Sequence, residues 1–186
     1  MTLKEMKVKV LALIEELNPD STLLTDDPDI STKLNGVINQ VMFELARMKK
    51  IPATATETVT ANEMFDMNEL DNFYQLRLLR FKNEAGEDAS YEMIENMVIF
   101  PENGTATFFY YKYPELITDT TKDNYEFELS QDALEIMPYG VAGDLLKSDV
   151  STEYGTIYST RYETMLQRLD PRYSMSSIYI EGGVNI

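Results

Sequence analysis

The 186-residue sequence contains no cysteine and no histidine. Without cysteine the chain forms neither disulfides nor thiolate metal sites, and it fits a reducing compartment. Without histidine it lacks the commonest general base, the commonest zinc ligand and every Ser–His or Cys–His nucleophile. An enzyme built on this chain would have to work with carboxylates, lysine or tyrosine alone. We therefore expect a protein that is not an enzyme, with no catalytic residues, no cofactor and no metal site.

Positive charge is also scarce, because 16 Lys and Arg face 32 Asp and Glu, which leaves a formal net charge of −16. Nucleic-acid affinity comes from Lys and Arg displacing counterions, so such a chain is a poor DNA binder. Anionic membranes repel it, and no apolar run approaches the length of a membrane span. The charge suits a surface past which DNA must move without sticking. Solubility alone explains it as well.

Two helices are predicted at the N-terminal end. Apolar residues at spacings of three and four follow a Thr2–Glu5 capping box and continue to a stop signal at 18–20. Asp27 is placed to cap the second helix, with Pro28 at its first position. Because the connection is short, we expect the two helices to pair as an antiparallel hairpin.

Two further helices are predicted near the C-terminal end. The third begins near Ser130, but Pro138 would leave a carbonyl unpaired and clash with the preceding turn. We therefore expect a short turn over 131–136, a kink, and a helix over 138–147. The fourth helix is expected over 152–169. Small residues in the third helix would allow close contact with a neighbouring helix: Gly140, Ala142 and Gly143.

Between these helical ends the pattern changes to β. Residues 73–81 alternate loosely, and 91–94 with 97–100 form a predicted hairpin. Asn103-Gly104 is a strong two-residue turn signal before a strand over 105–113. A short alternating run, Tyr125–Leu129, follows. We expect one small antiparallel sheet of about four to six strands.

The predicted fold class is therefore α+β: a four-helix bundle-like core, made of a helical hairpin and two C-terminal helices, with an inserted small antiparallel β-sheet. The predicted domain limits are 1–54 for the N-terminal helical hairpin, 55–129 for the inserted β sub-domain, 130–170 for the C-terminal helices and 171–186 for an extended tail.

The candidate chemical sites have simpler explanations. The carboxylates of Asp26–Asp29 lack the spaced ligands and central glycine of a calcium loop, so capping and solvation explain them better. No pattern indicates hydrolysis by a carboxylate pair. The apolar C-terminal tail is the better candidate for binding, because such a segment can add a strand to another protein's sheet or dock in a groove. Alternatively, it folds back on its own sheet. The candidate partner-binding residues are Tyr173, Met175, Ile178, Tyr179, Ile180, Val184 and Ile186.

Five segments, in this order, carry a family resemblance over residues 2–170: DDPDI, FYQLRLLRF, YYKYPELITDTTKDNYEFEL, the pattern IMPYGVAxxLLKSD, and RYETMLQRL. Together they resemble the head–tail adaptor (connector) proteins of tailed bacteriophages, including the tail tubular and portal-bound adaptor group. Proteins of that family are structural. Copies assemble into a ring, commonly a dodecamer, beneath the portal of the DNA-filled head, and the C-terminal segment typically engages the portal.

The resemblance implies three protein partners: the portal protein, neighbouring copies of the chain, and a downstream tail or nozzle protein. It implies that DNA passes the channel without specific binding, that no membrane is involved, and that the protein resides at the virion neck after assembly in the host cytoplasm. Either the tail or the loops of the sheet would contact the portal. The alternative function is an acidic DNA mimic or another protein-binding regulator, which would need rows of paired carboxylates on one face, whereas the acids here are dispersed.

Overall fold

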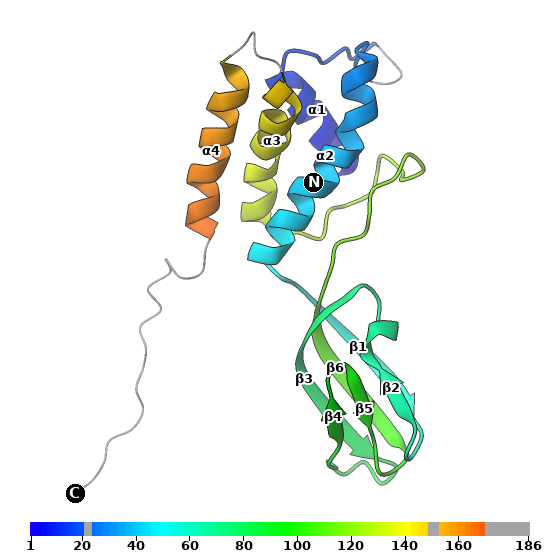
Figure 1. Cartoon of the computed structure of the whole chain (residues 1–186). Helices are drawn as coiled ribbons and strands as arrows, with labels where there is room; N and C mark the ends of the chain where they lie inside the picture. Colours follow the sequence, from blue (N-terminus) through cyan, green and yellow to red (C-terminus); the bar gives the residue numbers. More distant parts are fainter. Residues whose placement is uncertain (21–23, 149–152, 170–186) are drawn as a thin grey trace, which may run out of the picture.

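The computed structural model describes residues 1–20, 24–148 and 153–169. These residues form four α-helices and two small antiparallel sheets, so the fold is α+β. Figure 1 shows the helices gathered in one half of the molecule, the helical lobe, and the strands in the other, the β lobe. The strands separate α1 and α2 from α3 and α4 along the chain.

The caps of the first two helices agree with the sequence prediction. Helix α1, Leu3–Leu13, begins with the Thr2–Glu5 capping box. Helix α2, Pro28–Met48, begins at Asp27, whose side chain accepts hydrogen bonds from the backbone N–H groups of the next turn. These bonds satisfy donors that the helix itself leaves unpaired.

The end of α1 differs from the prediction. The helix stops at Leu13, and Glu15 adopts a left-handed conformation with φ 61°. The predicted continuation to 18–20 is therefore wrong. Leu17, at the helical spacing of four from Leu13, packs against the helical core from the loop that follows.

Helix α3, Gln131–Leu145, is one continuous helix with Pro138 inside it, so the predicted short turn over 131–136 and the predicted helix start at 138 are wrong. A proline inside a helix costs about 3 kcal/mol. Burying one Leu- or Met-sized side chain is worth about 1.5–3 kcal/mol, and Leu134, Ile136, Met137 and Val141 are all buried. The free energy gained by burying several sides of α3 thus outweighs the cost of placing Pro138 inside a helix.

The predicted four-helix bundle core is also wrong. The strands separate the helices along the chain, and the other three helices each pack against α3. No backbone contact of comparable extent links α1 to α2, as the expected hairpin would require. Helix α4, Tyr154–Leu169, has α3 as its main packing partner among the helices. A side chain at Gly140 would meet the Tyr162 ring, and one at Gly143 would meet Ser159. These glycines allow the predicted close contact between α3 and α4.

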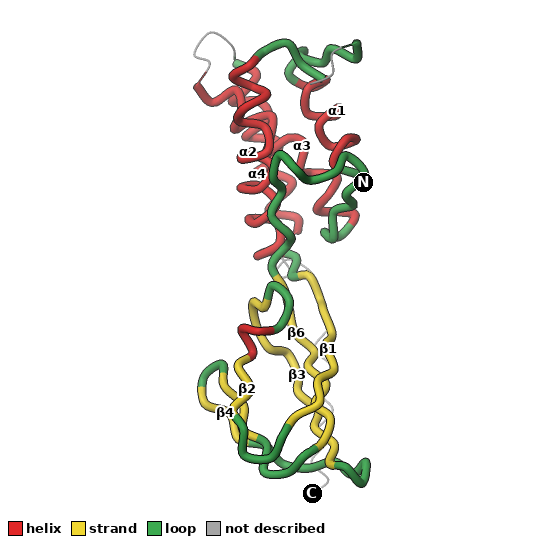
Figure 2. Tube along the Cα trace, turned by 90° about the vertical axis from the view of Figure 1, so that its right-hand side faces the viewer, coloured by secondary structure: helices red, strands yellow, loops and turns green. Residues whose placement is uncertain are grey.

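The β lobe contains two three-stranded sheets rather than the single sheet that the sequence predicted. The order in the larger sheet is β1-β6-β3, and in the smaller it is β2-β5-β4. Figure 2 shows the two sheets as separate layers. The strands are β1 Ile51–Val59, β2 Met64–Asp66, β3 Phe73–Asn83, β4 Glu92–Ile94, β5 Met97–Ile99 and β6 Gly104–Lys112.

Two turns between these strands have different roles. The predicted hairpin around Glu95 is confirmed, since β4 and β5 pair there. Asn103-Gly104 does not join paired strands, because β6 leaves β5 and pairs with β1 and β3. A Cβ atom at Gly104 would overlap the carbonyl oxygen of Lys82. Glycine is therefore required there by the close approach of β3 rather than by a hairpin turn.

Each lobe has its own apolar core. The helical core includes Ile117, Phe127 and Leu129 from the loop after β6. Burial alternates along Tyr125–Leu129 as predicted, but the run forms only an isolated bridge, between Thr2 and Glu126. Figure 2 shows this loop rising from the β lobe and lying against the helices.

The lobes are joined where the chain enters β1 and where it leaves β6. At the entry, Lys50 donates to Gln75 at 2.6 Å and lies over the Tyr111 ring. At the exit, Lys112 donates to Glu128 at 2.6 Å and lies 3.6 Å from Asp71. The hydrogen bond to Glu128 raises the pKa of Lys112, so its charge is held at the junction.

Candidate interaction surfaces

The seven predicted binding residues of the tail lie outside the described residues, and their role stays a prediction: Tyr173, Met175, Ile178, Tyr179, Ile180, Val184 and Ile186. Within the described ranges no group of three Asp or Glu side chains could hold a metal ion. Among the same residues, no helix combines the length and apolar character needed to cross a bilayer.

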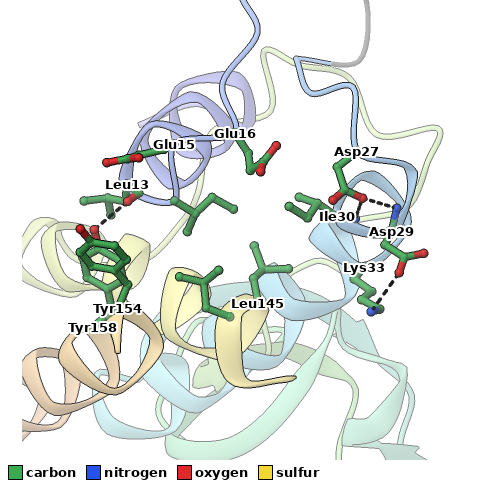
Figure 3. A pocket seen from close by; sticks show the side chains of 12 residues that line it. Leu13, Glu15, Glu16, Asp27, Asp29, Ile30, Lys33, Leu145, Tyr154 and Tyr158 are labelled. Carbon is green, nitrogen blue, oxygen red and sulfur yellow. Dashed lines mark hydrogen bonds and ion pairs between the residues drawn. The ribbon is translucent and has the colours of Figure 1, made fainter. Parts of the chain in front are cut away.

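A hollow of about 440 Å³ lies in the helical lobe, beside the ends of all four helices. Figure 3 shows Glu15 and Glu16 on one side of it and Asp27 and Asp29 on the other. Leucine and isoleucine side chains, including Leu145, form its apolar part. Asp27 is engaged in capping α2, and Asp29 faces Lys33 at 4.0 Å. Asp27 and Asp29 therefore have structural roles at the start of α2.

Two tyrosine hydroxyls fix α4 to the helices beyond α3. Tyr158 donates to the carbonyl of Leu13 at 2.6 Å, and Tyr162 donates to Glu44 at 2.8 Å. Burial, reinforced by the Glu44 carboxylate, raises the pKa of Tyr162 far above its ordinary value of 10.0. The neutral phenol is thus part of the folded structure.

We expect the protein to lose stability as the pH rises above 10. An unfolded tyrosine releases its proton near pH 10, while folded Tyr162 keeps it, so this contribution is complete below pH 10 and is lost above it. Burial also raises the pKa of Tyr125, to about 12, which acts in the same direction. Urea unfolding at a series of alkaline pH values measures the effect. Tyr162→Phe should reduce the alkaline loss, at a cost of about 0.5–1.5 kcal/mol near neutrality.

The control for this experiment is Tyr154→Phe, because Tyr154 is exposed. It should leave both the neutral stability and the alkaline loss at the wild-type level. An alkaline loss of unchanged size in Tyr162→Phe would contradict the role given to this hydroxyl.

An exposed side of α4 carries a stripe of residues at helical spacings of four, three and four: Ile157, Arg161, Thr164 and Arg168. All four residues are exposed, and Ile157 is 54% exposed. We call these four residues the α4 stripe.

The loop between β6 and α3 carries acids on its outer side. Glu115, Asp119, Asp123 and Glu126 are exposed, and Lys122 is the one cation from 113 to 130. Leu116 is 59% exposed beside them. We call residues 115–126 the acidic loop.

The outer face of the smaller sheet is a third surface with apolar side chains. Met64 pairs with Ile99 in one row, and Met97 pairs with Ile94 in the next. Met64 is 63% exposed and Ile94 60%, whereas Phe65, on the other face, stacks on Phe108 in the core. This face is therefore uncovered within the described chain.

Sequence reasoning missed all three surfaces. Alternation in strands as short as β2 and β4 does not say which face is buried. A helix at the edge of a lobe can leave apolar positions in solvent, and its sequence alone does not say which. The one available signal was the arginine pair at a spacing of seven residues, Arg161 and Arg168, in a strongly acidic chain. Comparison with family models and with curated proteins finds no match to the sequence.

Proposed function

We propose that the chain is a structural protein of a phage virion, a ring-forming adaptor that joins the head portal to the tail around the DNA exit channel. The observation that carries the proposal is the presence of exposed apolar residues on three separate surfaces: the α4 stripe, the acidic loop and the outer face of the smaller sheet. An uncovered apolar sheet face favours a protein contact. Several such surfaces suit a protein with neighbours on several sides.

Two further features support this function. The net charge of −16 suits a wall along which DNA moves without binding. The five segments that resemble head–tail adaptors provide the class of partners: the portal, neighbouring copies and a downstream tail or nozzle protein. The place of action is then the virion neck, with assembly in the host cytoplasm.

The decisive experiment mixes the purified chain with the portal protein of the same genome and measures complex formation by sedimentation and electron microscopy. We expect a ring of chains on the portal. A portal that remains free at every ratio of the two proteins would overturn the proposal.

The same assay identifies the portal contact. Deleting residues 171–186 should abolish binding if the tail engages the portal. The double variant Met64→Ser with Ile94→Ser removes apolar surface only from exposed positions of the smaller sheet, and it should abolish binding if the sheet makes the contact. Equal binding by the truncated chain would exclude the tail assignment.

A further inference from the structure

The α4 stripe and the acidic loop lie on opposite sides of the helical lobe. Figure 1 shows α4 at the left edge of the lobe and the loop after β6 at its right. In Figure 2, which looks onto the right-hand side, the loop lies in front of the helices. The two surfaces therefore cannot meet within one chain, but each is open to a neighbour.

The α4 stripe has positive charge that the described chain does not neutralise. No described carboxylate lies within ion-pair distance of Arg161 or Arg168. The Arg161 guanidinium lies 4.2 Å from the centre of the Tyr139 ring, which orients it without compensating its charge. Exposed Ile157 adds an apolar contact point on the same line. The stripe therefore combines one apolar anchor with two cations.

The acidic loop has the opposite composition and is held in place. Asn39 accepts from the N–H of Ile117 at 2.9 Å and donates to its carbonyl at 2.7 Å. The Ile117 side chain is buried in the helical core, which leaves the neighbouring Leu116 in solvent. The exposed acids flank this leucine along the loop. The loop therefore combines one apolar anchor with several anions.

We propose that the α4 stripe of one copy docks on the acidic loop of the next copy, with Ile157 against Leu116 and the arginines against the surrounding acids. An apolar centre with a charged rim is the usual anatomy of a protein interface, and complementary charge selects the partner and its register. When two different surfaces of the same protein bind each other, every assembly has one free α4 stripe and one free acidic loop at its ends, so further copies can add. The assembly closes into a ring if the rotation between successive copies divides a full turn. The inference rests on the proposed function, because it identifies this contact as the one between neighbouring copies in the ring.

Charge also argues against the other occupants of the stripe. Pairing two α4 stripes about a two-fold axis would place arginine opposite arginine, which is repulsive. DNA would meet only two arginines on a chain whose net charge is −16, and that charge opposes binding. A second copy supplies the missing acids on a surface that is already exposed.

Disulfide trapping tests the contact directly, because the natural chain has no cysteine. The double variant Leu116→Cys with Ile157→Cys should give a ladder of covalent oligomers on oxidation of the concentrated protein. Each single variant should stay monomeric, since its cysteine has no partner across the contact. The matched control, Leu116→Cys with Met93→Cys, pairs the loop with an exposed residue of the β lobe and should also stay monomeric.

Charge reversal tests the same contact without a covalent link. Arg161→Glu with Arg168→Glu should weaken self-association in sedimentation by about tenfold or more, and so should Glu115→Lys with Asp123→Lys. Combining the four changes in one chain should restore association. Raising the salt from about 0.05 M to about 0.5 M should weaken the wild-type contact, since exposed charges are screened.

The inference is overturned if the double-cysteine variant yields no more oligomer than the matched control. It is also overturned if the variant with all four charge changes self-associates as weakly as the two double charge-reversal variants. Both readouts use the free protein. A portal that fails to bind would therefore remove the proposed function and leave this contact standing. If the chain binds the portal but the double-cysteine variant forms no covalent oligomers, the proposed function stands and this contact is excluded.

Discussion

Replacing Phe108 with alanine is expected to unfold the β lobe while the helical lobe stays folded. Phe108 is fully buried in β6, the central strand of the larger sheet, and it stacks on Phe65 of the smaller sheet at 4.9 Å between ring centres. Removing a buried phenylalanine costs about 3–5 kcal/mol, which is a large share of the stability of a small domain. The two apolar cores share no residues. The loss is therefore confined to one of them.

Amide hydrogen exchange, read lobe by lobe, measures this outcome. Protection should fall throughout β1, β3 and β6 and persist in α2 and α3. Phe109→Ala is the matched control, because Phe109 is next in sequence but half-buried on the opposite face, where Arg80 lies over its ring at 5.8 Å. It should cost much less. Equal loss of protection in both lobes would show that they unfold as one unit.

Replacing Gly143 with valine is expected to force α4 away from α3. A Cβ atom at Gly143 would lie 2.6 Å from the Ser159 hydroxyl, 3.0 Å from its backbone nitrogen and 3.2 Å from its Cα. Two of these three atoms belong to the backbone, so the clash cannot be relieved by a rotamer change. Overpacking of this kind costs about 1–3 kcal/mol, and more where the backbone must move. Because α3 is the main packing partner of α4, we expect the protection of α4 from hydrogen exchange to fall most.

Gly36→Ala is the control for this substitution. Gly36 also lies within a helix, α2, but a Cβ atom there meets nothing within 4 Å. Alanine should stabilise the protein by about 0.8–1.0 kcal/mol, because glycine is the poorer helix former. The melting temperatures of both variants distinguish the effect of a steric clash from the effect of helix propensity. A higher melting temperature for Gly143→Val would show that the two helices do not meet as described.

Local features of the fold were predictable because they depend on neighbours in sequence. The Thr2–Glu5 box and the Asp27 cap follow from side chains that reach N–H groups within three residues. The β4–β5 hairpin likewise depends on a short turn. Small residues at Gly140 and Gly143 correctly indicated a close helix contact.

Features that depend on distant partners were not predictable. Pro138 appears as a helix breaker until the burial of α3 against three other helices is known. A short connection suggested pairing of α1 with α2, but both helices face α3, which follows the whole β lobe in sequence. The exposure of Ile157 depends on α4 having no further neighbour on its outer side. The domain limits and the role of the tail stay predictions.

The central place of α3 has a consequence for synthesis. The apolar faces of α1 and α2 are completed only by residues 131–145, which leave the ribosome after all six strands. The β lobe draws its core from a continuous stretch of chain, so it can form first, while the nascent N-terminal helices still expose leucine, methionine and valine side chains. Translation of the β lobe is therefore an interval in which these helices are open to a chaperone or to premature association.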